Sequence, residues 1–150
     1  MKSLQTAERE IIDTFESFAT IDEKYAYLFQ VGESLPPMDP KLKADDTLVK
    51  GCQSSLWFHL TQDEGRFSLN ADSDSLVIKG IAALLVKLIE GRTAEEILAI
   101  NMDFIDQLNI WKLASERNSG LMAMLNHIHN LARTEQATQG NERGQSPQEG

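Results

Sequence analysis

Cys52 is the only cysteine in this sequence of 150 residues, and no other side chain is as suited to nucleophilic chemistry. It lies within Val49-Lys-Gly-Cys-Gln-Ser-Ser-Leu-Trp-Phe58, between Gly51 and the pair Gln53 and Ser54. Glycine adopts backbone angles closed to other residues, and the end of this stretch has strand character. Reactive side chains are often found on such loops at the mouth of a strand. A lone cysteine is also often a buried hydrophobe, so both interpretations stay open here.

Metal binding has little support in the sequence. A zinc or iron–sulfur site within one chain needs several cysteine or histidine ligands at workable spacing. Cys52 is accompanied only by His59, His127 and His129. The last two are two positions apart on an expected helix, so they point in different directions. We expect both to be ordinary surface residues.

Hydrolysis and nucleotide binding are equally poorly supported. A Cys–His hydrolase needs a base within reach of the thiol. His59 lies seven residues beyond Cys52, on an expected strand that rises about 3.3 Å per residue. Glycine-rich nucleotide-binding motifs are absent from the sequence. What remains is chemistry that needs one thiol, which is thiol exchange or sulfur carriage.

Composition and charge indicate a single soluble domain. The length of 150 residues and the 41% of hydrophobic residues are typical of one globular domain. A net charge of −9 without a basic run argues against nucleic acid as a partner. The charge suits a partner protein with a basic patch, or it serves solubility alone.

The cysteine count and the distribution of apolar residues indicate the compartment and whether the protein associates with membranes. One cysteine excludes an intramolecular disulfide, and the first residues lack the apolar core of a signal peptide. The longest apolar run, Ile81–Val86, is too short to span a bilayer. We therefore expect a cytoplasmic protein that does not bind membranes.

The elements that must position Cys52 begin with a helical hairpin. Thr6 is the candidate N-cap of a first helix. Thr20-Ile-Asp-Glu23 matches a capping box and opens a second helix that ends near Gly32. The three prolines of Leu35–Pro40 exclude helix interior, so this segment should carry the chain to the Cys52 loop.

A β-hairpin and a buried helix form the expected centre. The segments 55–61 and 66–71 resemble strands joined by the turn Asp63-Glu-Gly65. Two strands are marginal alone, so we expect about three, with a third that the sequence does not place. Leu76–Ile89 is apolar nearly all round and should be a helix buried across the hairpin. Gly80 within it costs about 1 kcal/mol relative to alanine, which indicates close packing against another backbone.

The remaining chain is predicted to be helical up to a polar tail. Thr93-Ala-Glu-Glu96 is a second capping box, and Met102–Ala114 resembles a broken helix. A last helix should begin near Asn118-Ser-Gly120. Residues 134–150 contain a single alanine as their only apolar residue, too little to offset the entropy of ordering. We predict one α+β domain over residues 1–133 and a disordered tail over 134–150.

Five strings of this sequence together resemble the SufE family of sulfur acceptors for cysteine desulfurases, which includes the related CsdE proteins. They follow one another in the family's order and extend the likeness from the first helix to about residue 133. The strings are Leu35-Pro-Pro, Leu48-Val-Lys-Gly-Cys-Gln-Ser-Ser-Leu-Trp57, Ala71-Asp-Ser-Asp74, Val77-Ile-Lys-Gly-Ile81 and Arg117-Asn-Ser-Gly-Leu121.

The resemblance implies a fold and a role. The fold would be α+β, with a small antiparallel sheet packed against several helices as in the IscU scaffold. The protein would be a sulfur carrier and activator, not an enzyme with its own substrate. It would take persulfide sulfur from a PLP-dependent desulfurase of the SufS or CsdA type and pass it to a SufBCD-type scaffold for iron–sulfur cluster assembly. The protein would bind no cofactor itself, because PLP belongs to the desulfurase.

The resemblance also assigns residues. Cys52 matches the acceptor cysteine, and Gly51, Gln53 and Ser54 would shape its loop. Asp74 and Arg117 would shape the Cys52 pocket or the docking surface; the alternative for each of them is a helix cap or a surface ion pair. We expect Trp57 to be core.

Two alternatives to the carrier stay open. The chain could be a noncatalytic interaction module in which Cys52 is a buried structural residue. It could also be a small thiol enzyme that turns over its own substrate.

Overall fold

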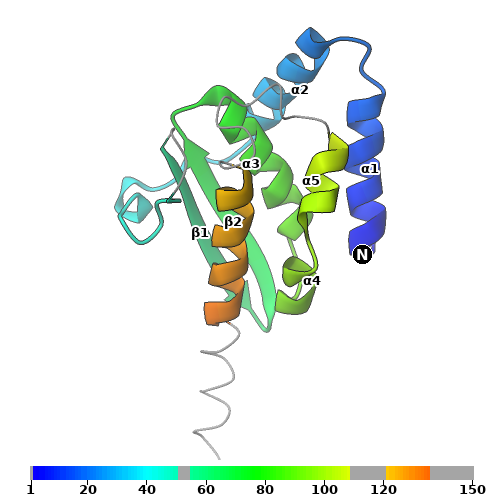
Figure 1. Ribbon diagram of the computed structural model, residues 1–150. Coiled ribbons are helices and arrows are strands. Elements are labelled where there is room, and N and C mark those ends of the chain that lie inside the picture. The colour runs from blue at the N-terminus through cyan, green and yellow to red at the C-terminus, as the bar shows by residue number, and fades with distance from the viewer. Residues whose placement is uncertain (1, 51–54, 109–120, 136–150) are drawn as a thin grey trace, which may run out of the picture.

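The computed structural model describes residues 2–50, 55–108 and 121–135. In chain order (Figure 1), the elements are α1 Leu4–Glu16, α2 Ile21–Glu33, the 3₁₀ helix η1 Pro40–Leu42, β1 Leu56–Asp63, β2 Arg66–Ser73, α3 Leu76–Ile89, α4 Ala94–Leu98 and α5 Met102–Leu108. A further helix covers residues 121–135. The expected α+β class is confirmed.

The two strands form an antiparallel hairpin that runs from Leu56 opposite Ser73 to Asp63 opposite Arg66. Its turn is made by Glu64 and Gly65, which have φ values of 53° and 79°. Two consecutive positive φ angles are those of the tight turn that matches the twist of a hairpin, and glycine favours it. The buried side chains alternate along the strands and form an inner face. They are Leu56, Phe58, Leu60, Phe67, Leu69 and Ala71.

The sheet has fewer strands than expected. Two full strands are present among the described residues, where the sequence suggested about three. The segment beside β1 is Thr47–Val49, which joins it through a bridge between Leu48 and Trp57. Among the described residues this pairing is an isolated bridge and does not make a third strand.

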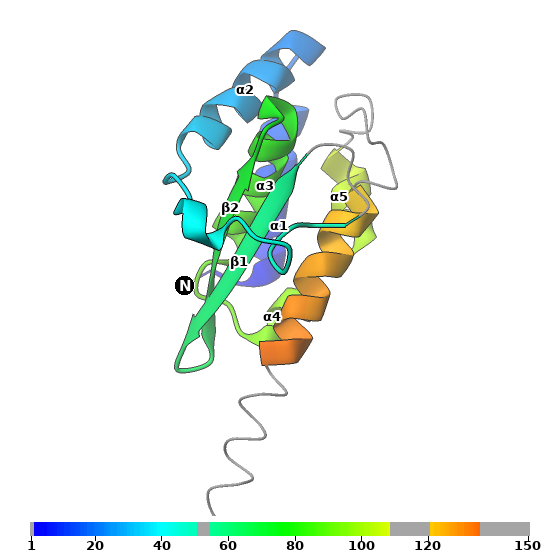
Figure 2. The same cartoon turned by 90° about the vertical axis from the view of Figure 1, so that its left-hand side faces the viewer.

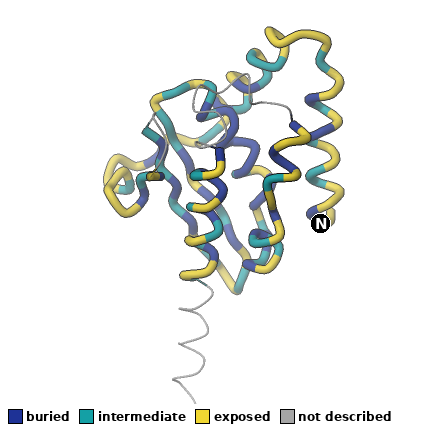
Figure 3. Tube along the Cα trace, viewed as in Figure 1, coloured by how far each residue is buried: buried dark blue, intermediate teal, exposed yellow. Residues whose placement is uncertain are grey.

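Helix α3 forms the centre of the molecule, as its composition predicts. It packs on β2 on one side and on α2 on the other, and Figure 3 shows its trace mostly buried. At the crossing, a Cβ on Gly80 would lie 2.4 Å from the carbonyl oxygen of Leu28. The predicted close backbone approach at Gly80 is therefore confirmed. The first residue of α3, Leu76, differs from the other apolar residues of the helix because it is exposed.

The other helices surround α3 on the inner side of the hairpin. Helix α1 contacts α3 and α5, and the helix of residues 121–135 lies along β1 (Figures 1 and 2). This last helix includes Thr134 and Glu135, so helical structure extends two residues into the segment predicted as a tail. The rest of that segment, residues 136–150, lies outside the described residues.

Helix caps were predicted with mixed success. Thr20 and Thr93 are N-caps, and Thr93 forms the complete capping box with Glu96. The first helix begins earlier than expected, because Ser3 is its N-cap and accepts a hydrogen bond from the Thr6 N–H. Serine is as good a cap as threonine, so the sequence offered both starts.

Candidate functional site

The loop with Cys52, Gly51, Gln53 and Ser54 lies outside the described residues, but both of its ends are described. Before the loop, the Val49 N–H donates to the Leu56 carbonyl (2.8 Å), and the Thr47 carbonyl accepts from the Phe58 N–H (2.9 Å). The chain therefore enters and leaves the Cys52 loop as two adjacent antiparallel segments. A nucleophile on such a connection is presented from a fixed base.

Asp74 holds the outgoing end of this loop. Its Oδ1 accepts the Ser55 N–H at 3.0 Å, and its own N–H donates to the Ser55 carbonyl at 3.2 Å. The Ser73 hydroxyl donates to that same carbonyl at 2.6 Å. The backbone of Ser55 is thus tied in both directions to the junction between β2 and α3. The structure places Asp74 against Ser55, the first described residue after the Cys52 loop, and Arg117 lies outside the described residues.

The incoming end is held from the outer side of the hairpin. The Thr47 hydroxyl is buried and accepts the Ala44 N–H at 3.1 Å. The Lys43 ammonium pairs with Asp72 at 2.8 Å and lies 4.9 Å from the centre of the Trp57 ring. The expectation that Trp57 belongs to the core is wrong. Its neighbours Leu56 and Phe58 face inward, so strand alternation turns Trp57 outward, where Lys43 covers it.

Asp72 has a perturbed acidity. Burial alone would raise the pKa of its carboxyl. Hydrogen bonds from Lys43 and from the Ser73 N–H, together with the Lys79 charge 3.4 Å away, outweigh burial and hold the pKa below its ordinary value. The ionised Asp72 carboxylate therefore connects Lys43, in the segment before Cys52, with Lys79, in the first turn of α3.

His127 and His129 are not the ordinary surface residues that we expected. Both are partly buried. His129 Nε2–H donates to the carbonyl of Ile100 at 2.7 Å, and the His127 ring lies 6.1 Å from that of Phe58. The signal was present in the helical spacing, since His127 follows the buried Met124 by three positions.

His127 lies close enough to Lys50, the last described residue before the Cys52 loop, for the Lys50 charge to act on it. The His127 Nε2 is buried and has no hydrogen-bond partner within residues 2–50, 55–108 and 121–135. Burial and then the nearby Lys50 ammonium hold the pKa of His127 below its ordinary value. Since Lys50 is two residues before Cys52, a neutral imidazole and a cation both lie close to where the loop begins.

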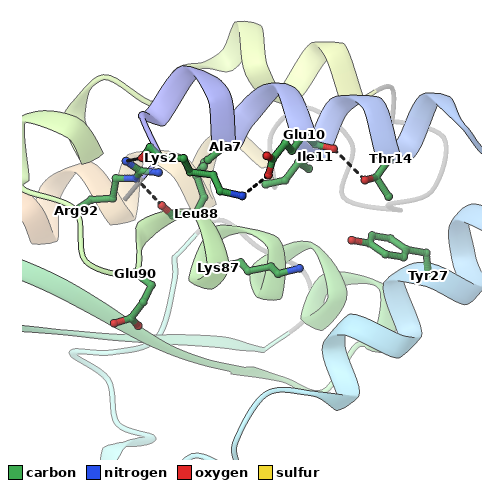
Figure 4. Close-up of a pocket in the computed structure, with 10 residues that line it drawn as sticks. All are labelled: Lys2, Ala7, Glu10, Ile11, Thr14, Tyr27, Lys87, Leu88, Glu90 and Arg92. Carbon is green, nitrogen blue, oxygen red and sulfur yellow. Dashed lines mark hydrogen bonds and ion pairs between the residues drawn. The ribbon is translucent and has the colours of Figure 1, made fainter.

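The structure also contains a cavity of about 480 Å³ bounded by α1, α2 and α3. Figure 4 shows the Lys87 ammonium and the Tyr27 hydroxyl pointing into it, with Ile11 and Leu88 supplying apolar surface. Burial raises the pKa of Tyr27. The described residues that line the cavity come from Lys2 ahead of α1, from α1, α2 and α3, and from the segment just after α3.

The described part of the chain offers neither a metal-binding cluster nor a membrane span. Within residues 2–50, 55–108 and 121–135, no three His, Cys, Asp or Glu side chains are grouped so that they could hold a metal ion. No described helix combines the length and apolar character needed to cross a membrane.

The family model for the SufE Fe–S metabolism associated domain matches residues 9–132, which include Cys52 and both ends of its loop. The chain belongs to the SufE family. Its domain type is associated with iron–sulfur metabolism, which supports a role for this SufE-family chain in the sulfur metabolism of iron–sulfur clusters.

Three proteins similar to this SufE-family chain are longer than it is. It is 41% identical over 119 residues to SufE-like protein 1, chloroplastic/mitochondrial, of Arabidopsis thaliana, covering 78% of this chain and 32% of that protein. It is 32% identical over 123 residues to two chloroplastic quinolinate synthases of Nicotiana tabacum, covering 81% of this chain and 16% and 17% of those proteins. The chain thus spans a third or less of the length of these relatives.

A solved structure agrees with the fold. The solution structure of a hypothetical protein from Thermus thermophilus superposes with a TM-score of 0.72 and covers 85% of this chain and 94% of that one. The two sequences are 21% identical, so the likeness concerns the fold alone.

Proposed function

We propose that this SufE-family chain is a sulfur acceptor that takes persulfide sulfur from a cysteine desulfurase onto Cys52. The observation that carries the proposal is the family match over residues 9–132, which contain the only cysteine of the chain. The anchored ends of the Cys52 loop support it, because a carrier must present its thiol to a partner from a defined base.

The exchange needs one thiolate. The Cys52 thiolate attacks the terminal sulfur of the persulfide on the desulfurase cysteine, in analogy to thiol–disulfide exchange. The bond between that sulfur and the desulfurase Sγ breaks, a bond to the Cys52 Sγ forms, and the desulfurase cysteine leaves as thiolate. Oxidation level is conserved overall, so no further oxidant or reductant is required. Removal of the persulfide frees the desulfurase for another turnover.

The chain's own charges favour this chemistry. The Lys50 ammonium is two positions from Cys52 along the chain, and a nearby cation stabilises a thiolate. A second transfer would then pass the sulfur to a SufBCD-type scaffold. PLP would be bound by the desulfurase, whether of the SufS or the CsdA type, and this chain would bind no cofactor. A cytoplasmic location stays a prediction.

The proposal is tested by desulfurase turnover. A purified cysteine desulfurase is supplied with cysteine and PLP, and alanine formation is followed with and without this protein. We expect stimulation by the wild type and none by Cys52→Ser, which keeps the size of the side chain but lacks the thiol. Equal stimulation by both proteins would instead support an interaction module in which Cys52 is structural. Turnover of a small thioester by the isolated protein would support a thiol enzyme.

A further inference from the structure

The cavity bounded by α1, α2 and α3 has the size and lining of a small-molecule site. Its volume of about 480 Å³ lies within the roughly 300–1,000 Å³ that is typical of such sites. Ala7 and Ile11 from α1 and the buried Leu88 from α3 supply apolar surface. Small-molecule sites combine an apolar wall of this kind with a few polar groups that orient the ligand.

Two polar groups of different helices reach into this cavity. The Lys87 ammonium from α3 and the Tyr27 hydroxyl from α2 point toward one another in Figure 4. Within the described part of the chain, neither group has a hydrogen bond or an ion pair. A partly buried tyrosine hydroxyl usually has a hydrogen-bond partner, so these two groups form a donor pair that is available to a ligand.

Ring packing fixes the direction of the Tyr27 hydroxyl. The Tyr27 ring stands edge-on to the Phe15 ring with centroids 5.5 Å apart, and its centroid lies 5.3 Å from that of Phe18. A group that is already oriented costs less entropy when a ligand binds. Because burial raises the pKa of Tyr27, the hydroxyl keeps its proton at neutral pH and acts as a donor.

The other charged side chains of the lining are engaged elsewhere. Lys2 forms an ion pair with Glu10. Arg92 pairs at 3.0 Å with a glutamate of α4, and Glu90 accepts the hydroxyl of a β2 serine at 2.9 Å. Figure 4 shows the Glu90 carboxylate turned away from Lys87. Among the described lining residues, Lys87 therefore provides the positive charge that has no partner.

We propose that this cavity binds a small organic monocarboxylate with an apolar body, of the kind represented by a medium-chain fatty acid. The carboxylate accepts hydrogen bonds from the Lys87 ammonium and the Tyr27 hydroxyl. The apolar body packs against Ile11 and Leu88 and gains affinity by leaving water. One ammonium matches one negative charge, whereas phosphate groups are typically held by bidentate arginines or helix N-termini. The site goes beyond the proposed sulfur transfer and does not rest on it.

An NMR titration of the isotope-labelled protein with octanoate tests the site. We expect saturable shifts, at millimolar concentrations or below, of the backbone amides beside the cavity on α1, α2 and α3. Octanol lacks the charge and acetate lacks the apolar body, so each should leave these amides close to their ligand-free positions at the same concentration. Inorganic phosphate should also leave them unchanged.

Three variants test the proposed contacts. Lys87→Gln removes the charge and should weaken octanoate binding about fivefold. Lys41→Gln is the matched control, because Lys41 is also exposed but does not line the cavity, and it should bind like wild type. Tyr27→Phe keeps the ring and loses the hydroxyl, so it should also weaken binding about fivefold. Circular dichroism establishes that each variant is folded.

Three outcomes would overturn the proposal. The first is the absence of saturable octanoate shifts, or their confinement to parts of the molecule away from the cavity. The second is equal octanoate affinity of wild type and Lys87→Gln, which would mean that the ammonium does not hold the carboxylate. The third is octanol binding as tight as octanoate binding, which would describe an apolar cavity without preference for an anion.

Discussion

At the scale of single residues, Asp74 connects the Cys52 loop to the rest of the molecule. Its carboxylate accepts the Ser55 N–H, and that interaction spans 19 positions of sequence. The Asp74 side chain is not the N-cap of α3, because Ser75 supplies that cap. Its role in shaping the Cys52 pocket or the docking surface stays a prediction.

Asp74→Ala should lower the free energy of unfolding by about 1 kcal/mol, since one hydrogen bond to backbone is lost. Asp74→Asn retains an acceptor oxygen and should stay close to wild type. Urea unfolding measures both, with Asp45→Ala, the removal of another exposed carboxylate, as control. A stable Asp74→Ala with unchanged reactivity of Cys52 toward iodoacetamide would argue against a positioning role.

His127 gives the fold a dependence on pH. Its pKa is lowered in the folded protein, chiefly by burial, so the unfolded chain binds the proton more readily. The stability that this residue supports is therefore present above its unfolded pKa of about 6.5 and is lost as pH falls toward the folded value. We expect His127→Leu to lose less stability than wild type between pH 8 and pH 5.

Urea unfolding at several pH values measures this difference. His129→Leu is the control, because its ring is hydrogen-bonded to Ile100 and the variant should already be less stable than wild type at pH 8. Parallel pH profiles of wild type and His127→Leu would contradict the assignment.

At the scale of elements, the crossing of α2 and α3 determines how α3 is placed under the hairpin. A Cβ on Gly80 would meet the Leu28 carbonyl oxygen at 2.4 Å and its carbon at 2.8 Å. These are backbone atoms, so the helices would have to separate.

Gly80→Ala should therefore destabilise the protein by about 1–3 kcal/mol, despite the higher helix propensity of alanine. Gly32→Ala is the matched comparison, because its Cβ would lie 3.2 Å from the Gly80 nitrogen, and it should cost less. Thermal or urea unfolding measures the stability of both variants and therefore which of them is the less stable. A Gly80→Ala variant that is as stable as wild type would mean that the helices separate at little cost.

The segment before Cys52 is a second element whose placement can be tested. Asp72 pairs with Lys43 and Lys79, and its lowered pKa means that this stability is present above the unfolded value of about 3.9 and is lost as pH falls through the folded value.

Asp72→Asn should therefore be less stable than wild type at pH 7, by about 1 kcal/mol or less because the pair is partly exposed. The difference should shrink below about pH 4. Acid titration of both proteins, followed by tryptophan fluorescence, measures this gap. A constant gap down to pH 2 would assign the effect to packing instead.

At the scale of the whole molecule, local patterns predicted most of the architecture. The hairpin followed from alternation and the turn at Gly65, and the buried helix followed from an apolar run with Gly80 inside it. Long-range pairings were not predictable in the same way. The bridge between Leu48 and Trp57 joins the segments on either side of the Cys52 loop, and no local pattern specifies such a pairing.

The residues around the site were predicted with the same limitation, because a local pattern does not specify which residues meet in the folded chain. Composition singled out Cys52, and the resemblance pointed to Asp74. Trp57 was misplaced because three successive large apolar residues hide which of them faces inward, and Leu76 was expected to be buried with the rest of α3. His127 was expected at the surface because its direction was considered relative to His129 only. Its spacing of three positions from the buried Met124 indicates partial burial.

The central claim is that sulfur is carried on Cys52, and the intact mass of the protein tests it most directly. The protein is incubated with a cysteine desulfurase, PLP and cysteine, and its mass is taken without reductant. The account predicts a gain of one sulfur atom that is lost with dithiothreitol and absent in Cys52→Ser. An unchanged mass with desulfurases of both the SufS and the CsdA type would contradict it.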